Sequence, residues 1–197
     1  AYGDIGVLLG RAIAASPAFQ AAGRFRGAET IRATVVGAGS HATDLSGSTI
    51  FYRDIPFPLK NLPILKLTAQ EERGDAAALA QSIRDKLGWF ADEGGLSQLV
   101  LALRGEDNPT YSRIQALARG VADGLAPLRA AGFVPIVAVE CDQAKVLGQA
   151  LAPLVDGPLL CLDGVGVDSG DYLDIGAPVA GGTVLPVVIK TLAFQKS

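Results

Sequence analysis

The chain has 197 residues, of which 49% are hydrophobic and 19% charged, and its formal net charge is -3. This composition predicts a soluble globular chain with ample material for a core. Dispersed Lys and Arg and an aromatic content of only 6% argue against nucleic acid as a partner. No apolar run approaches the roughly 18 residues that span a bilayer, and no signal-peptide pattern opens the chain, so we expect a cytoplasmic protein without membrane contact.

The cysteine and histidine content argues against a metal site. Cys141 and Cys161 lie in or at the end of apolar runs, which favours reduced, structural thiols. His41 is the only histidine, and no Cys-x-x-Cys occurs. Because the sequence contains no Met, we expect it to be a piece of a longer polypeptide.

The order of apolar patterns predicts an α/β fold. A short helix is expected from Asp4 to Ala15, where apolar residues recur at helical spacing until Pro17 stops them. Strands are expected over 31–38, 48–52, 62–67, 99–103, 134–140 and 159–162, and helices over 71–90, 110–131 and 143–155. Strands that alternate with helices are typical of parallel pairing through crossovers. We predict a mixed sheet flanked by helices, with the last three strands parallel and buried.

The end of the chain predicts a β-hairpin. Residues 171–194 contain two apolar runs around Gly181-Gly182, which is a turn signal. Pro178 and Pro186 place this hairpin at a sheet edge or at bulges, because proline cannot donate to a strand ladder. Any subdivision of residues 1–197 should be soft and fall near 94–95.

The segment from Gly37 to Gly47 is the main candidate for a nucleotide loop. Gly37, Gly39 and Ala42 match the G-x-G-x-x-A spacing of dinucleotide sites, but Ser46-Gly47 interrupts the long helix that such a loop must open. Small residues at two successive turns would allow backbone to lie against a base or ribose. A strand–turn–strand corner without a ligand is the alternative.

Several acids mark other candidate sites. Glu140 and Asp163 follow two predicted parallel strands, at the edge where open α/β sheets bind ligands. Asp168, Asp171 and Asp174 have the composition of a hard-cation site, although turn formation is the better interpretation because Asp bonds nearby backbone N–H groups.

Four segments of the chain carry a resemblance to a known family. Residues 29–50 and 170–194 resemble the C-terminal half of the EutA family of ethanolamine ammonia-lyase reactivating factors, and residues 4–11 and Asn108-Pro109 also fit. The family is similar to actin-like ATPases of the Hsp70 type, in which two ribonuclease-H-like lobes close on ATP and Mg2+. The resemblance implies that residues 1–197 are the second lobe, without the N-terminal lobe.

The resemblance also implies a nucleotide site. The segment Thr34–Ser40 would match the adenosine motif of that superfamily. The residues expected to contact ATP or ADP are Gly37, Ala38, Gly39, Ser40, Ser46 and Gly47. Groups that hold phosphate and Mg2+ would come mainly from the missing lobe. This fragment alone is therefore expected to hold no tightly bound cofactor and to hydrolyse ATP poorly, and no catalytic residue is assigned.

The implied function is chaperone-like. ATP binding and hydrolysis would open ethanolamine ammonia-lyase, so that damaged cobalamin leaves and adenosylcobalamin enters. The setting would be the bacterial cytoplasm, with a homodimer and association with an ethanolamine-utilisation microcompartment left open. Two other classes stay open from the residues themselves. One is a protein-interaction module with the same fold and no catalysis, and the other is an independent α/β enzyme that uses Glu140 and Asp163.

Overall fold

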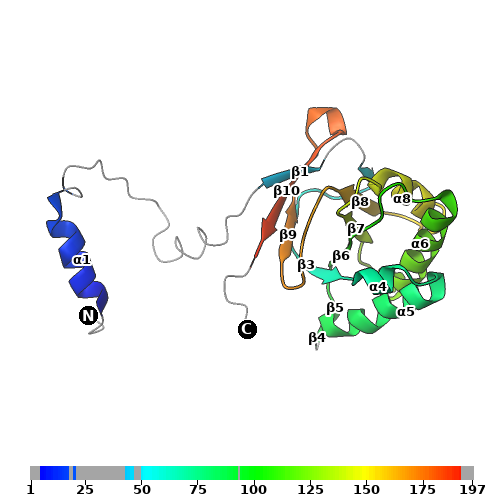
Figure 1. Cartoon of the computed structure of the whole chain (residues 1–197), viewed down its shortest axis with the longest axis horizontal. Helices are drawn as coiled ribbons and strands as arrows, with labels where there is room; N and C mark the ends of the chain where they lie inside the picture. Colours follow the sequence, from blue (N-terminus) through cyan, green and yellow to red (C-terminus); the bar gives the residue numbers. More distant parts are fainter. Residues whose placement is uncertain (1–4, 18–19, 21–42, 47–49, 93, 192–197) are drawn as a thin grey trace. The chain divides into compact units, whose positions relative to one another are not determined.

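The computed structural model in Figure 1 describes residues 5–17, 20, 43–46, 50–92 and 94–191. The chain divides into two units, Ala1–Gly37 and Ala38–Ser197. In the first unit, α1 spans Ile5–Ala15 and confirms the helix predicted from the apolar spacing. Its Leu8 and Leu9 are exposed. The predicted strand over 31–38 lies outside the described residues.

The described part of the second unit is built on an eight-stranded mixed sheet with the order β1-β10-β9-β3-β6-β7-β8-β2. The strands are β1 (Thr43–Ser46), β2 (Phe51–Arg53), β3 (Leu59–Lys66), β6 (Val100–Leu103), β7 (Ile136–Val139), β8 (Leu159–Asp163), β9 (Tyr172–Ile175) and β10 (Leu185–Lys190). Strands β3, β6, β7 and β8 are parallel, and their neighbours at both ends of this group are antiparallel. Every residue of β6, β7 and β8 is buried, which confirms the predicted parallel core.

Helices cover one face of this sheet. They are α4 (Ala69–Glu72), α5 (Ala76–Leu87), α6 (Tyr111–Gly124), α7 (Ala126–Ala130) and α8 (Ala144–Leu151). Leu79, Leu117 and Leu147 from three of them share one apolar cluster with Leu101 and Val137 of the sheet. Burial of each such leucine contributes about 1.5–3 kcal/mol to the free energy of folding. The packed helices therefore hold the strands, and the loops at their ends, in place.

The opposite face is closed by the strands themselves and by loops. Ile136 of β7 belongs to the same apolar cluster as Leu173 of β9 and Val187 of β10, and Val165 and Val167 from the loop after β8 complete it. The loop between β8 and β9 therefore packs against the sheet through Val165 and Val167.

Two predicted helices are each broken in two. The prediction of one helix over 71–90 is wrong, because Asp75 caps a new helix by accepting a hydrogen bond from the backbone N–H of Ala78 at 2.8 Å. The helix predicted over 110–131 is interrupted at Leu125 because Pro127, in the first turn of α7, has no N–H to continue the ladder.

The glycines near 94–95 and 181–182 both form turns. Gly94 and Gly95 lie inside the second unit, where β4 (Ala91–Asp92) and β5 (Gly95–Leu96) pair antiparallel. At the C-terminal end, β9 and β10 form the predicted hairpin, with a short 3-10 turn, η2, over Ala180–Gly182. The prolines predict that the hairpin lies at a sheet edge or at bulges. In the structure β1 pairs with β10 on the side away from β9, so the strand that contains Pro186 is the second strand from the edge.

Candidate functional site

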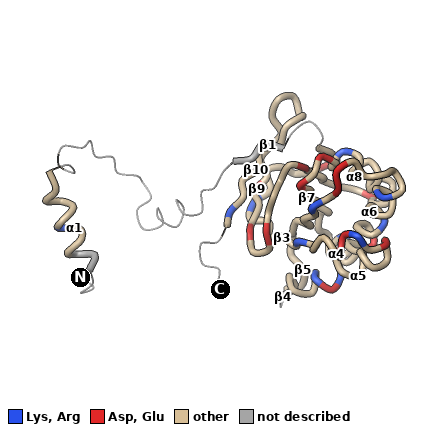
Figure 2. The backbone as a smooth tube through the Cα atoms, in the orientation of Figure 1, with Lys and Arg blue, Asp and Glu red and all other residues tan. Residues whose placement is uncertain are grey.

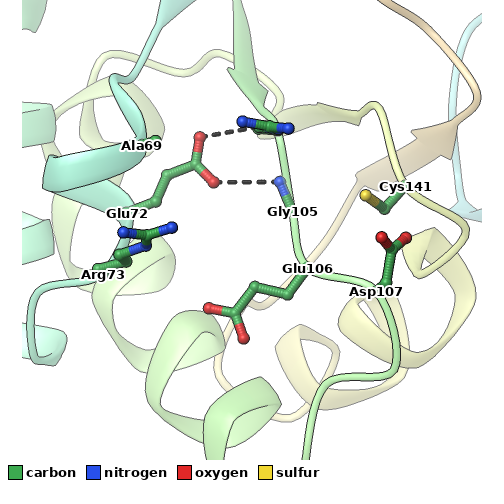
Figure 3. Close-up of a pocket in the computed structure, with 8 residues that line it drawn as sticks. Ala69, Glu72, Arg73, Gly105, Glu106, Asp107 and Cys141 are labelled. Carbon is green, nitrogen blue, oxygen red and sulfur yellow. Dashed lines mark hydrogen bonds between the residues drawn. The ribbon is translucent and has the colours of Figure 1, made fainter.

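Two neighbouring hollows lie where β3, β6 and β7 end. We call them the rim pocket, of about 270 Å³, and the Lys66 pocket, of about 440 Å³. The rim pocket is lined by Ala69, Glu72, Arg73, Arg104, Gly105, Glu106, Asp107 and Cys141 (Figure 3). The Lys66 pocket is lined by Lys66, Leu67, Thr68, Ala69, Arg104, Glu140 and Ser169. The carboxyl ends of parallel strands are the usual ligand-binding edge of an open α/β sheet.

Charged residues of both signs gather around these hollows, and Figure 2 shows acidic and basic positions close together around α4 and α5. Helix α4 begins with a capping box, in which Thr68 accepts from the backbone N–H of Glu71 and Glu71 accepts from the backbone N–H of Thr68. This box fixes the short helix that carries Glu72 and, directly after it, Arg73.

Glu72 forms the inner wall of the rim pocket. Its carboxylate is 6% exposed and accepts hydrogen bonds from the backbone N–H groups of Arg104 at 2.8 Å and Gly105 at 3.1 Å (Figure 3). Burial raises the pKa of Glu72, and the two N–H groups offset only part of that rise. The carboxylate therefore joins α4 to the loop after β6 and holds the pocket open.

Arg113 of α6 supports the same wall from behind. Its guanidinium donates to a carboxylate oxygen of Glu106 at 2.7 Å and to the backbone oxygen of Gly74 at 3.3 Å, and it also contacts the backbone oxygen of Glu72. One cation thus fixes the end of α4 and the orientation of Glu106.

Lys66 occupies the centre of the second hollow. Its ammonium donates to the backbone oxygen of Val167 at 2.6 Å, to Asp168 at 2.8 Å and to Glu140 at 3.2 Å. Partial burial favours a lower pKa for Lys66, but the hydrogen bonds to Asp168 and Glu140 outweigh it and leave the pKa raised. Lys66 remains charged and ties the loop after β8 to the ends of β3 and β7.

The two cysteines differ in exposure. Cys141 is partly exposed on the rim pocket, where burial and then the adjacent carboxylate of Asp107 raise the pKa of its thiol. Cys161 is fully buried in β8, and burial raises its pKa further. Raised thiol pKa values oppose a nucleophilic role, since the thiolate is the reactive form.

The glycine segment predicted to contact adenosine is not tested by the structure. Gly37, Ala38, Gly39, Ser40 and Gly47 lie outside the described residues. Ser46 is the last residue of β1, where it pairs with Leu185. The nucleotide site stays a prediction.

The two strand-end acids have different surroundings. Glu140 lines the Lys66 pocket and is ion-paired with Lys66. Asp163 is 5% exposed and accepts a hydrogen bond from the backbone N–H of Ala144 at 3.2 Å, at the start of α8. Asp163 therefore has a structural contact with the start of α8, and the independent-enzyme hypothesis stays a prediction.

The three acids after β8 are engaged with protein groups. Asp171 accepts from the backbone N–H of Asp168 at 2.8 Å, which is the turn contact expected for it. Asp174 accepts from the backbone N–H of Asn61 at 2.7 Å and pairs with Lys190 at 2.6 Å. Among the described residues, no group of three or more His, Cys, Asp or Glu side chains is arranged to hold a metal ion.

Sequence reasoning missed the rim pocket. The prediction of one helix over 71–90 includes both Glu72 and Arg73, and it misses the break between α4 and α5 that directs them toward β6. The signal that could have identified the pocket is the charged run from Arg104 to Asp107, which follows a buried apolar strand directly.

Comparison with known proteins decides the family. The family described as "Ethanolamine utilisation protein EutA" matches residues 1–195. The chain belongs to the EutA family. This confirms the resemblance identified from the sequence.

Two curated EutA proteins show how much of the family's length the chain covers. The Ethanolamine ammonia-lyase reactivase EutA of Salmonella typhimurium (strain LT2) is 37% identical over 195 residues, and that of Escherichia coli (strain K12) is 35% identical over 194 residues. Each match covers 98% of this chain and 40% of the relative, so the chain spans about two fifths of the EutA proteins it matches.

No solved structure matches the chain. The α/β fold with a mixed sheet and helices is confirmed, whereas the ribonuclease-H-like, actin-like assignment stays a prediction. Within the described part of the chain, no helix combines the length and apolar character needed to cross a bilayer.

Proposed function

We propose that this chain is part of a reactivating factor that acts on ethanolamine ammonia-lyase. The observation that carries the proposal is the family match over residues 1–195, together with two relatives that are named reactivases of that enzyme and align with almost all of this chain. The proposed task is to release damaged cobalamin from the lyase, so that adenosylcobalamin can enter.

We further propose that ATP drives this exchange. Binding and hydrolysis would favour different shapes of the factor, and the difference in their contacts with the lyase would open it. The residues assigned to the adenine nucleotide are Gly37, Ala38, Gly39, Ser40, Ser46 and Gly47. ATP and Mg2+ would be held together with groups from a second lobe, because positioned phosphate and metal contacts dominate catalysis of phosphoryl transfer.

The test is recovery of lyase activity. Ethanolamine ammonia-lyase carrying an inactive cobalamin is incubated with the full-length protein, ATP, Mg2+ and adenosylcobalamin, and ethanolamine turnover is followed. We expect activity to return only when the protein and ATP are both present. A folded protein that leaves the lyase inactive would contradict the reactivase proposal, and recovery without nucleotide would contradict the ATP step alone.

A further inference from the structure

Two arginines line the rim pocket with guanidinium groups that have no partner in the part of the chain that the structure describes. Arg73 follows α4 and Arg104 follows β6, and both line the hollow of about 270 Å³. Within the described residues, neither side chain forms a hydrogen bond or an ion pair. Arg104 also borders the Lys66 pocket, so it stands between the two hollows.

Three of the four carboxylates around the two hollows already have protein partners. Glu72 accepts from two backbone N–H groups, Glu106 is paired with Arg113 at 2.7 Å, and Glu140 is paired with Lys66 at 3.2 Å. The fourth, Asp107, lies beside Cys141 and remains an acceptor (Figure 3). Each guanidinium offers five N–H donors. The charged groups of the rim pocket that remain for a ligand are therefore two guanidinium groups against one carboxylate.

A buried amide lies behind the wall of the rim pocket. Gln143 is 3% exposed, and neither its amide nitrogen nor its amide oxygen has a partner among the described residues. It borders a cavity of about 10 Å³, whose lining includes Glu72, Gly105 and Glu106 of the rim pocket. A cavity of this size holds about one water molecule.

Gly105 separates Gln143 from the rim pocket. Its φ is +77°, and a Cβ placed on it would lie 2.2 Å from the amide nitrogen of Gln143. The wall is thus bare backbone, and an unpartnered amide lies immediately behind it. A buried amide without partners is costly, so we expect the small cavity to hold a water that bonds Gln143.

We propose that the rim pocket binds a small molecule through an oxyanion, a phosphate or a carboxylate, held between Arg73 and Arg104. Guanidinium groups match both oxyanions because they donate two parallel hydrogen bonds. One water in the small cavity would link Gln143 to this site. The pocket volume suits a metabolite-sized ligand. The site uses residues outside the glycine segment and depends on neither nucleotide nor lyase.

Cys141 provides a local reporter, because it lines the same pocket. In the full-length protein, alkylation of Cys141 by iodoacetamide is followed by peptide mass spectrometry with inorganic phosphate, acetate or chloride at equal ionic strength. We expect millimolar phosphate or acetate to slow alkylation at least about threefold relative to chloride, because a bound oxyanion would occupy the pocket. Protection by phosphate alone would assign a phosphate ester, and protection by acetate alone a carboxylate.

Variants tie the protection to the two arginines. Arg73→Gln and Arg104→Gln should each weaken oxyanion binding about tenfold, through loss of a charged hydrogen-bond pair. Arg119→Gln is the matched control, because Arg119 is an exposed arginine of α6 outside the pocket. Cys161 is fully buried, so it should react with iodoacetamide only when the protein unfolds. Absence of alkylation at Cys161 therefore shows that a variant is folded. Two results would overturn the proposal: absence of protection by either oxyanion in the native protein, or protection in both pocket variants that is as strong as in the native protein.

Discussion

The carboxylate of Glu72 lies 3.1 Å from the backbone nitrogen of Gly105 and fastens α4 to the loop after β6. Its other oxygen accepts from the backbone N–H of Arg104 at 2.8 Å. Both donors belong to a chain segment that leaves the sheet, so no ladder partner satisfies them. A buried carboxylate with two backbone donors therefore replaces the missing strand contacts and shapes the rim pocket.

Replacing Glu72 with glutamine should destabilise the protein. The variant puts an amide NH2 group opposite one of two backbone N–H donors, so one donor loses its acceptor. We expect a loss of about 1–3 kcal/mol in the free energy of unfolding, although the change removes a buried charge. Glu106→Gln is the control, because Glu106 is 44% exposed and its pairing with Arg113 is worth less than about 1 kcal/mol. Urea denaturation gives the free energy of unfolding of both variants, and equal values for the two would contradict this role for Glu72.

Gly105→Ala should be more harmful than a change at an open glycine with similar backbone. The added Cβ would meet the amide nitrogen of Gln143 at 2.2 Å and a methyl group of Val139 at 2.7 Å. We expect a loss of about 2–4 kcal/mol, the sum of a positive φ and overpacking. Gly132→Ala has φ +86° with nothing within 4 Å, so it should cost only about 1 kcal/mol.

A double variant separates the two causes at Gly105. Gln143→Ala removes the group that the new Cβ would strike, so Gly105→Ala should cost less in that background than in the native chain. Identical costs in both backgrounds would mean that Gln143 contributes nothing, and that backbone strain and the contact with Val139 explain the effect.

Stability should fall in acid because of Glu71. Burial raises the pKa of Glu71, but its hydrogen bonds with Lys86 at 2.7 Å and with Thr68 outweigh this and lower the pKa below 4.5. Because the pKa of Glu71 is lower in the folded protein, the pair of Glu71 and Lys86 contributes its full stability at pH values above 4.5. This contribution is lost as the pH falls through the lowered pKa. Lys86→Met keeps the apolar stem and should cost about 1–2 kcal/mol at neutral pH.

The pH dependence of that cost is the decisive feature. Lys86 also donates to the backbone oxygen of Lys66 at 3.0 Å, a contact that does not require Glu71 to be ionised. The stability difference between the native chain and Lys86→Met should therefore shrink, without vanishing, once Glu71 is protonated. Guanidinium denaturation across the acid range measures it, and a difference independent of pH would show that Glu71 is not involved.

The central sheet was predictable because its signal is local. Continuous apolar runs such as Leu101 to Leu103 lie between amphipathic segments, and burial on both faces follows from parallel pairing. Helix ends were less predictable. Periodicity continues across Gly74 and Leu125, and the breaks depend on a cap at Asp75 and a missing N–H at Pro127.

The site was harder to predict than the fold. The contact from Glu72 to Gly105 joins residues 33 apart, and no spacing rule indicates it. The acids Glu140 and Asp163 were correctly located at strand ends, yet their roles depend on Lys66 and Ala144, which approach from other elements. Position along one strand shows where an acid lies, whereas its partners decide what it does.

The glycine segment allows a separate test of the nucleotide proposal. If backbone at Gly39 approaches the nucleoside, Gly39→Val should weaken ATP binding and lyase reactivation in the full-length protein far more than it lowers the melting temperature. If Gly39 only serves a turn with positive φ, the change should cost about 1 kcal/mol or more of stability. Melting temperature and the ATP dissociation constant are measured on the same variant, and a destabilised protein with unchanged affinity would remove Gly39 from the site.

Release of cobalamin tests the proposed reactivase function most directly. Ethanolamine ammonia-lyase is loaded with an inactive cobalamin, mixed with the full-length protein, ATP and Mg2+, and separated from small molecules by filtration. The absorbance of cobalamin in the filtrate is then compared with that of samples lacking either the protein or ATP. We expect cobalamin to appear in the filtrate only when the protein and ATP are both present. Cobalamin that stays with the lyase, although the protein is folded and ATP is in excess, would contradict the proposed function.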